Sequence, residues 1–206
     1  MNEETLHRRQ AMLDYDTAMR TQFGVICGVD EAGRGPLAGD VYAAAVILRE
    51  GHGIVGLDDS KKLSEKRREA LFTEIQEKAE AFCIATASVA EIEEINILEA
   101  AMLAMRRAVA GLQQQPDYVL VDGNRWPGVP QNGETVVKGD ATSASIAAAS
   151  ILAKVARDHY MLEQAALYPE YAFEKHKGYG TAAHTAALRQ YGPCPIHRRS
   201  FLKKIL

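Results

Sequence analysis

Short apolar runs alternate with longer segments of helical periodicity along this chain. The runs have the length of β-strands and are rich in Val, Ile and Ala. Turn-forming Gly, Pro, Asn and Asp residues stand between them, as is typical of strand boundaries. This pattern predicts five strands, at residues 24–30, 41–48, 82–89, 117–122 and 134–138.

The helical segments have apolar residues spaced three and four positions apart. They predict helices at about residues 6–20, 64–79, 91–112, 141–167 and 181–190. Ser64 is placed to cap the second of these, although Arg67 stands where a capping box would have an acid. In the third, an apolar stripe is expected to pack in the core; it comprises Ile92, Ile95, Leu98, Met102, Met105 and Val109.

The order of these elements predicts an α/β fold: a mixed five-stranded sheet flanked by helices on both faces. Its sheet core is expected over about residues 20–167. After Tyr168-Pro169 the composition changes, and His, Lys, Tyr and Gly become frequent. Residues 168–206 are therefore expected to form a helical extension of one domain that spans residues 1–206, since a chain of this length fits a single domain.

The overall composition is that of an ordinary globular protein, with 47% hydrophobic and 25% charged residues. No apolar run approaches the roughly 18 residues of a membrane span, and the first residues lack the apolar segment of a signal peptide. The three cysteines are odd in number and widely spaced, which indicates neither a disulfide framework nor a zinc site. Residence in the cytoplasm, with no membrane partner, is the simplest interpretation.

The net charge of −3 hides two local basic runs. Residues 61–68 carry five basic side chains and one acid, and residues 197–204 carry four Lys or Arg and no acid. A slightly acidic protein can bind a polyanion through such a local face. A solvated helix face is the alternative interpretation of each run.

Two adjacent carboxylates, Asp30 and Glu31, end the first apolar run, and Gly33-Arg34-Gly35 follows at once. Carboxylates hold hard divalent cations, glycine lets the backbone approach a ligand, and arginine meets phosphate. Together these residues point to metal-dependent chemistry on a phosphodiester.

Two further acids are expected at the same edge of the sheet. Asp122 ends the fourth predicted strand, and Asp140 lies between the fifth strand and the long helix. Sheet ends are where α/β proteins place ligand sites, and two cations roughly 4 Å apart are the usual device for phosphodiester displacement. A plain turn at Asp122-Gly123 and a helix N-cap at Asp140 are the structural alternatives.

Geometry constrains which acids can share the site. Neighbours on a regular strand point to opposite faces, so Asp30 and Glu31 require either a turn near Glu31 or a role for the Glu31 carbonyl. Asp158 is excluded, because the eighteen helical residues after Asp140 span about 27 Å. It is expected to pair with Arg157 or Lys154 instead.

At these residues the chain closely resembles the bacterial ribonuclease HII (type 2 ribonuclease H) family. The motifs that carry the resemblance run in family order through most of the chain. They are Asp30-Glu-Ala-Gly-Arg-Gly-Pro-Leu-Ala-Gly39, Asp59-Ser-Lys-Lys-Leu-Ser64, Val121-Asp-Gly123, Lys138-Gly-Asp140, Ala147-Ala-Ala-Ser-Ile-Leu-Ala-Lys-Val155, Lys177-Gly-Tyr-Gly-Thr181 and His197-Arg-Arg-Ser-Phe201.

The resemblance implies a ribonuclease H-like fold with a C-terminal substrate-binding extension. It implies an endonuclease that cleaves the RNA strand of RNA–DNA hybrids and incises duplex DNA 5′ of embedded ribonucleotides, leaving 3′-hydroxyl and 5′-phosphate ends. Two divalent ions, Mn²⁺ or Mg²⁺, are expected with substrate. Asp30, Glu31, Asp122 and Asp140 match the family's four catalytic acids, which hold these metals.

The resemblance also implies substrate-binding residues. Main-chain groups of Gly33-Arg34-Gly35 would read the 2′-hydroxyl that distinguishes RNA from DNA, while the Arg34 side chain contacts phosphate. Tyr179 matches the family tyrosine that stacks on the sugar at an RNA-to-DNA junction; without the family match, a tyrosine in a glycine-rich surface loop would be the simpler interpretation. Phosphate contacts are also expected from Lys61, Lys62 and Lys177.

Three rival interpretations remain at this point. Ribonuclease HIII resembles this family but normally carries an additional N-terminal domain, for which the residues before the first strand are too few. A resolvase of the same superfamily would act on branched DNA, and a non-catalytic module would bind hybrids without cutting them. Protein partners, a sliding clamp among them, are left open by the sequence, because the tail at residues 201–206 is too short to assign one.

Overall fold

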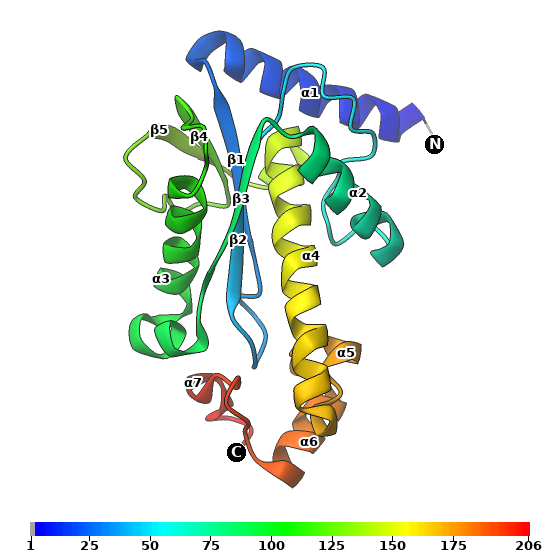
Figure 1. The fold of residues 1–206 in the computed structure, drawn as a ribbon, viewed down its shortest axis with the longest axis vertical. Coiled ribbons are helices and arrows are strands. Elements are labelled where there is room, and N and C mark those ends of the chain that lie inside the picture. The colour runs from blue at the N-terminus through cyan, green and yellow to red at the C-terminus, as the bar shows by residue number, and fades with distance from the viewer. Residues whose placement is uncertain (1–2) are drawn as a thin grey trace.

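Five strands form one mixed sheet in the order β3-β2-β1-β4-β5 in the computed structural model, which describes residues 3–206 (Figure 1). β2 pairs antiparallel with both β1 and β3, whereas β4 pairs parallel with both β1 and β5. The predicted mixed sheet is therefore confirmed. The strands are β1 (Ile26–Ala32), β2 (Val41–Ile47), β3 (Ala81–Ala87), β4 (Tyr118–Asp122) and β5 (Asn132–Val136).

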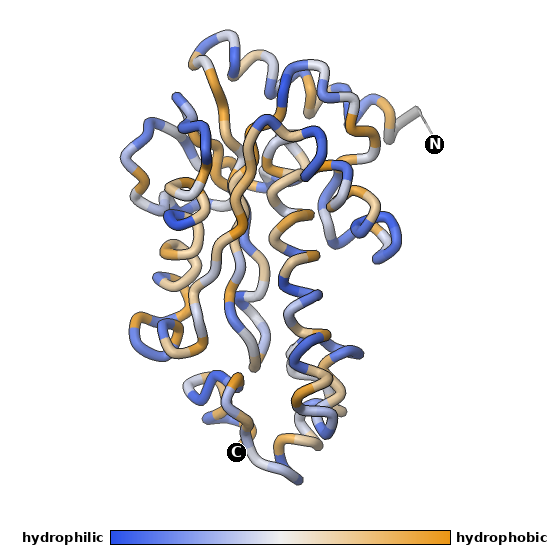
Figure 2. Tube along the Cα trace, in the orientation of Figure 1, coloured by the Kyte–Doolittle hydropathy of each residue, from blue (hydrophilic) through white to orange (hydrophobic). Residues whose placement is uncertain are grey.

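Helices cover both faces of this sheet. In Figure 1, α3 lies against one face and α4 against the other, while α1 crosses the end of the sheet nearest the N-terminus. Apolar segments of both covering helices are seen beside the strands in Figure 2. The helices are α1 (Glu3–Phe23), α2 (Glu65–Lys78), α3 (Val89–Ala110), α4 (Ala144–Leu167), α5 (Phe173–His176), α6 (Ala182–Tyr191) and α7 (Arg199–Leu202), with 3₁₀ turns η1 (Gly139–Ala141) and η2 (Pro169–Tyr171).

The alternation of side chains along β1 creates the two faces. Cys27 and Val29 belong to the apolar cluster under α3, and Gly28 faces α4. A Cβ atom at Gly28 would lie 2.1 Å from the main-chain carbon of Ser145. Because α4 presents small, fully buried side chains such as Ala147 and Ala148, the helix axis lies unusually close to the strand.

The stripe predicted along α3 is interrupted. Asn96 has φ 69°, so the element is two helices joined at a kink. Its side-chain oxygen accepts hydrogen bonds from the N–H groups of Leu98 (2.9 Å) and Glu99 (3.2 Å), which caps the second half. Five of the six predicted stripe residues pack in the core: Ile92, Met102, Met105 and Val109 are buried and Ile95 packs against them, whereas Leu98, next to the kink, lines a hollow at the sheet edge.

The long helix begins three residues later than predicted, at Ala144, and Ser143 is its N-cap. Asp140 therefore does not cap this helix; it lies in the preceding turn η1. The buried carboxylate of Asp16 on α1 holds the helix start. It accepts hydrogen bonds from the Ser143 hydroxyl (2.6 Å) and from both the N–H (2.8 Å) and the hydroxyl (2.7 Å) of Ser145.

The fifth strand is displaced from its predicted position. It starts at Asn132 and ends at Val136, two residues earlier than expected at each end. Lys138 stops it by adopting the left-handed conformation, with φ 57°. This reversal brings η1 back beside the end of β4.

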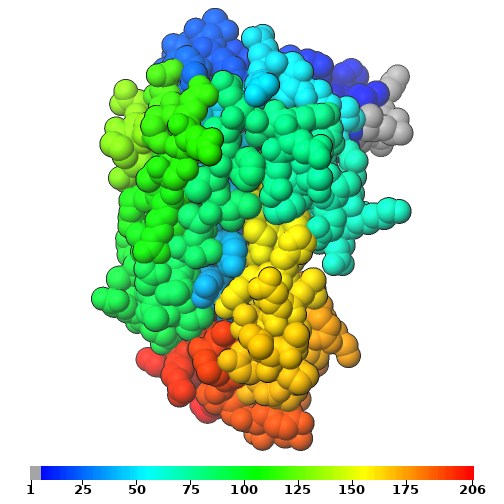
Figure 3. Space-filling view, in the orientation of Figure 1, coloured from blue at the N-terminus to red at the C-terminus, as the bar shows by residue number. Residues whose placement is uncertain are grey.

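Residues after α4 form a separate apolar cluster with the loop between β1 and β2. Tyr171, Phe173, Leu188 and Leu202 are buried there against Leu37 of that loop. Figure 3 shows these C-terminal segments, coloured orange to red, at the end of the molecule below α3 and α4. No helix within residues 3–206 is long and apolar enough to cross a membrane.

The contact between β1 and α4 predicts the effect of adding one methyl group. In Gly28→Ala the new Cβ meets main-chain atoms, which cannot move without displacing α4. We expect the free energy of unfolding to fall by about 3 kcal/mol, measured by urea denaturation. Gly35→Ala is the control, because a Cβ there meets only a ring atom of Tyr179 at 3.8 Å, and equal stability of the two variants would contradict this packing.

Candidate active site

Asp30 and Glu31 lie inside β1, which continues in regular pairing with β2 as far as Ala32. The chain turns at Gly33, whose φ is 99°, so the expected turn lies two residues after Glu31 and β1 is still regular at Glu31 itself. Pairing with β4 ends earlier, at Val29. Beyond Val29, β1 therefore has no strand partner on its β4 side. The side chains of Asp30 and Glu31 point to opposite faces of the sheet, and both can reach this unpaired side of β1.

Asp122 ends β4 at the same edge, and η1 is bound to it directly. The Asp122 Oδ1 atom accepts hydrogen bonds from the N–H of Gly139 (2.6 Å) and, at 3.4 Å, from the N–H of Asp140. Gly139 fits because a Cβ there would meet Ile146 at 2.6 Å. The turn that brings Asp140 to the sheet edge is thus built on Asp122 itself.

Two adjoining hollows open at this edge. The first, of about 270 Å³, is lined by Asp30, Glu31, Gly33-Arg34-Gly35, Lys61 and Tyr179, together with Ser60, Ser150 and Lys154. The second, of about 280 Å³, is lined by Asp122, Leu98, Met102 and residues 123–125. Glu31 and Arg34 line both hollows. Segments from six separate parts of the sequence therefore meet in one cleft.

Burial and mutual repulsion disfavour ionisation of the carboxyls at this edge. The pKa of Asp30 is raised well above its usual range by burial, then by the charges of Glu31 and Asp122. Burial also raises the pKa of Glu31, although Arg34 opposes the rise, and burial and Asp122 raise the pKa of Asp140. The acids form a concentration of negative charge that a cation would relieve.

This donor set fits hard divalent cations. All the contributing groups are carboxylates, which Mg²⁺ and Mn²⁺ prefer. Among the described residues, no three Asp, Glu, His or Cys side chains already stand together as a complete group for holding an ion. Magnesium sites on substrate phosphates commonly use only one or two carboxylates and fill the shell with water and phosphate oxygens, and this arrangement suits such a site.

A fifth carboxylate, Asp59, faces the cluster, and sequence reasoning did not single it out. Its Oδ1 atom accepts the N–H of Lys61 at 2.9 Å, and its side chain interacts with that of Asp140. Burial works to lower the pKa of Lys61, but attraction by Asp30, Asp59 and Asp140 raises it overall. The turn that follows Asp59 thus brings the positively charged side chain of Lys61 towards the acids.

The three lysines proposed from sequence are placed differently. Lys61 lines the first hollow, whereas neither hollow is lined by Lys62 or Lys177. The Lys62 Nζ atom lies 3.8 Å from Asp59, and the Lys177 Nζ atom donates to the Glu174 carbonyl at 2.5 Å.

The second basic run is not a uniformly solvated face. Arg198 is fully buried, and its guanidinium holds the loop that contains Gly33-Arg34-Gly35. It donates hydrogen bonds to the carbonyls of Gly33 (2.6 Å), Arg34 (3.0 Å), Pro36 (2.8 Å) and Gly39 (2.9 and 2.6 Å). Sequence reasoning placed Arg198 in a basic run for polyanions and missed this function.

A second buried arginine, Arg157 of α4, reaches the same loop. It donates to the carbonyls of Ala38 (3.0 Å) and Asp40 (3.3 Å), and to that of Lys177 (3.1 Å) in the C-terminal extension. Its guanidinium carbon lies 6.0 Å from the centre of the Tyr179 ring. Two guanidinium groups therefore fix the loop between β1 and β2 from behind and join it to the C-terminal extension.

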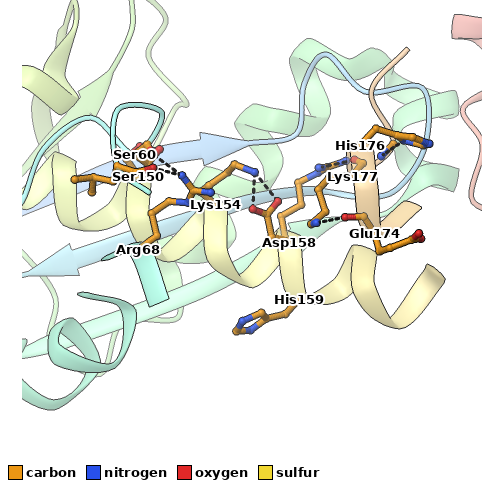
Figure 4. A network of polar contacts seen from close by, with 12 residues as sticks. Ser60, Arg68, Ser150, Lys154, Asp158, His159, Glu174, His176 and Lys177 are labelled. Atoms are coloured by element: carbon orange, nitrogen blue, oxygen red, sulfur yellow. Dashed lines mark hydrogen bonds and ion pairs between the residues drawn. The ribbon is translucent and has the colours of Figure 1, made fainter. Parts of the chain in front are cut away.

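Figure 4 shows the polar residues along α4 beside the cleft. The Lys154 Nζ atom bonds both carboxylate oxygens of Asp158, at 2.5 and 2.6 Å, which confirms the prediction that Asp158 pairs with a helical neighbour. One turn earlier, the hydroxyls of Ser150 and Ser60 lie 3.0 Å apart. Ser150 also hydrogen-bonds Asp30, so α4 and the loop before α2 meet at the first acid.

Comparison with known proteins agrees with this geometry. A family model described as Ribonuclease HII matches residues 27–204. A ribonuclease HII of Marinomonas sp. (strain MWYL1) is 64% identical over 191 residues, which cover 91% of this chain and 96% of the relative.

Solved structures share the fold. The ribonuclease H2 from Pyrococcus horikoshii OT3 is similar with a TM-score of 0.72 and 28% identity, covering 85% of this chain and 92% of that one. A chain from the PCNA:RNase HII complex of Archaeoglobus fulgidus has a TM-score of 0.68 and 23% identity, with 85% and 94% covered; at this identity the likeness concerns the fold alone.

A mixed sheet with carboxylates at its open edge, covered by helices on both faces, defines a nuclease of the ribonuclease H-like fold. Within that class, the chain belongs to the ribonuclease HII family.

Because Arg198 is buried and bonds several carbonyls, it should contribute more to stability than its exposed neighbour Arg199. Arg198→Lys loses the planar fork and leaves buried carbonyls unpaired, so we expect unfolding to become easier by about 2–4 kcal/mol. Arg199→Lys is the matched control, since Arg199 is exposed, and its change should stay within about 0.5 kcal/mol. Thermal and urea denaturation measure both. Similar losses in the two variants would show that the carbonyl contacts contribute little.

Proposed function

We propose that this protein is an endoribonuclease that hydrolyses the RNA strand of RNA–DNA hybrids and incises duplex DNA 5′ of embedded ribonucleotides. One observation carries the proposal. Asp30 and Glu31 share a cleft with Gly33-Arg34-Gly35 and Tyr179, and Glu31 and Arg34 join it to the hollow at Asp122. Metal-binding acids and groups suited to ribose recognition thus lie within the same site.

The four acids are proposed to be catalytic and to hold two divalent cations when substrate is bound. Asp30, Glu31 and Asp122 are the main ligands, and Asp140 faces the cluster from η1. Bound cations of this kind activate a water molecule and stabilise the leaving oxygen. Hydrolysis with departure of the 3′ oxygen leaves 3′-hydroxyl and 5′-phosphate ends. The carboxylate ligands suit Mn²⁺ and Mg²⁺ alike.

Substrate recognition is assigned to the loop after β1 and to the extension. The carbonyls of Gly33 and Arg34 are bound by the buried Arg198, so the main chain of this loop is held in place before substrate binds. We assign reading of the 2′-hydroxyl to the main chain of this loop. The half-exposed Arg34 side chain contacts phosphate, and the Tyr179 ring, 45% exposed, stacks on the sugar at the RNA-to-DNA junction.

Residues 168–206 are proposed to be the substrate-binding extension of the same domain, since they carry Tyr179 to the cleft. Lys61 is the lysine best placed for a phosphate, whereas contacts from Lys62 and Lys177 require their side chains to leave their present partners. A sliding clamp is a further candidate partner, because the similar A. fulgidus chain belongs to a PCNA:RNase HII complex. Residence in the cytoplasm stays a prediction.

Removing one acid tests the proposed chemistry. With Mn²⁺ or Mg²⁺, the wild-type protein should incise a DNA duplex containing one ribonucleotide on its 5′ side, and leave all-DNA and branched-DNA duplexes intact. Asp122→Asn should lower kcat about a hundredfold or more, because a charged cation ligand is lost, while binding persists. Asp14→Asn, an exposed acid on α1, should behave as wild type. Tight binding without incision by the wild type would establish a non-catalytic module instead. Cutting of branched DNA would establish a resolvase.

The placement of Lys61 predicts a specific electrostatic effect. Lys61→Ala should weaken hybrid binding and reduce the slope of log affinity against log salt by about one, as expected for one lost phosphate contact. Lys66→Ala, which removes an exposed charge from α2 outside both hollows, should leave the slope nearly unchanged. Fluorescence anisotropy over a salt series measures this, and equal slopes for both variants would remove Lys61 from the interface.

A further inference from the structure

Three histidines are buried behind Tyr179, and the proposed chemistry does not use them. His184 is fully buried, and His197 and His176 are 2% and 9% exposed. They lie in the extension, with the rings of His176 and His184 stacked at 4.5 Å. Each ring nitrogen has a defined neighbour, so the hydrogen-bond pattern can be worked out atom by atom.

Main-chain partners fix the tautomers of His197 and His184. The N–H of Cys194 lies 2.9 Å from His197 Nδ1, and since this N–H can only donate, Nδ1 carries no proton. Neutral His197 therefore carries its proton on Nε2 and donates it to His184 Nε2, 3.0 Å away. His184 then carries its own proton on Nδ1 and donates it to the carbonyl of Tyr179 at 2.9 Å.

These contacts form a directed chain from Cys194 through His197 and His184 to the main chain of Tyr179, here called the histidine chain. If His197 gained a second proton, its Nδ1–H would face the N–H of Cys194. If His184 gained one, its Nε2–H would face the Nε2–H of His197. Burial lowers the pKa of His197 to about 4, with the nearby His184 as a further cause, and burial also lowers the pKa of His184. Both rings are therefore neutral near pH 7.

His176 supports the same loop in a single tautomer. Its Nδ1 atom accepts the N–H of Gly178 at 3.2 Å, and its Nε2 atom donates to the carbonyl of Tyr171 at 2.9 Å. The carbonyl of Gly178 in turn accepts the N–H of Leu37 at 2.8 Å. The segment around Tyr179 is thus held by histidines on one side and by the loop between β1 and β2 on the other.

The Tyr179 side chain, in contrast, has few constraints. Its ring is 45% exposed at the cleft, and Arg157 lies over it at 6.0 Å. The direction of the ring is therefore set mainly by the main chain on which it stands. That main chain is bound at its carbonyl by His184 and by the N–H of Thr181, which lies 2.8 Å away.

We propose that His184, oriented by His197, is a positioning residue that fixes Tyr179 for recognition of the RNA-to-DNA junction. The inference rests on the proposed function, because it needs Tyr179 to act in junction recognition. Loss of the His184 bond should therefore affect substrates with a junction more than substrates without one.

The experiment uses the full-length protein and two substrates, a DNA duplex with one ribonucleotide and a uniform RNA–DNA hybrid. The measured quantity is the ratio of their kcat/KM values, here called the junction preference. His184→Leu should lower the junction preference about fivefold, as expected for one lost hydrogen bond. His184→Asn keeps an N–H donor near the Nδ1 position and should restore the preference to within about twofold of wild type.

Further variants separate positioning from folding. In a Tyr179→Ala background, His184→Leu should not change the junction preference further, because the coupled group is already gone. If His184→Leu does not fold, His197→Asn serves instead: it can still accept the Cys194 N–H but cannot reach His184. It should lower the preference in the same direction. A purely structural role would reduce cleavage of both substrates equally.

The outcomes distinguish the inference from the proposed function. An unchanged junction preference in folded His184→Leu or His197→Asn, with a reduced one in Tyr179→Ala, overturns the inference alone. An unchanged preference in Tyr179→Ala overturns the proposed role of Tyr179 and the inference with it. Failure of the wild type to cut either substrate overturns the proposed function.

Discussion

The close packing of α4 on β1 positions several parts of the candidate site. Gly28 permits this approach, because any side chain there would meet the helix main chain. Along its length α4 then meets three parts of the site in turn. Its first residues adjoin the turn that carries Asp140, its middle brings Ser150 to Asp30, and further along Arg157 binds the loop between β1 and β2. A change of the helix position would move all of these groups together.

The acids at the sheet edge work against stability. Burial and like charge raise the pKa of Asp30, Glu31 and Asp140, so the fold holds these groups in an unfavourable environment. Such local conflict is expected where function sets the residues. Lys61 and Arg34 offset part of the repulsion. The same charge concentration attracts divalent cations, which connects the electrostatic cost directly to the proposed chemistry.

The two segments to which the proposed function assigns substrate recognition are held from behind by buried polar groups. Arg198 satisfies several carbonyls of the loop after β1, and His184 binds the carbonyl of Tyr179. Both of these side chains are fully buried, and their bonds to main-chain carbonyls lie outside the helix and sheet hydrogen bonds. Buried donors of this kind are costly unless each finds a partner. Since they do, two irregular segments acquire fixed geometry at the cleft.

The sequence by itself determined the strands and most helices, because these depend on local periodicity and turn residues, and it placed Asp30, Glu31 and Asp122 where strands end. It also correctly assigned Asp158 to a helical ion pair, from helix length alone. The kink at Asn96, the helix start at Ser143 and the straight course of β1 past Glu31 were decided only by tertiary structure. The burial of Arg198 was also decided only by tertiary structure, because the basic run in which it lies is typical of a charged surface. Its partners lie about 160 residues away, and no local pattern records a contact between such distant segments.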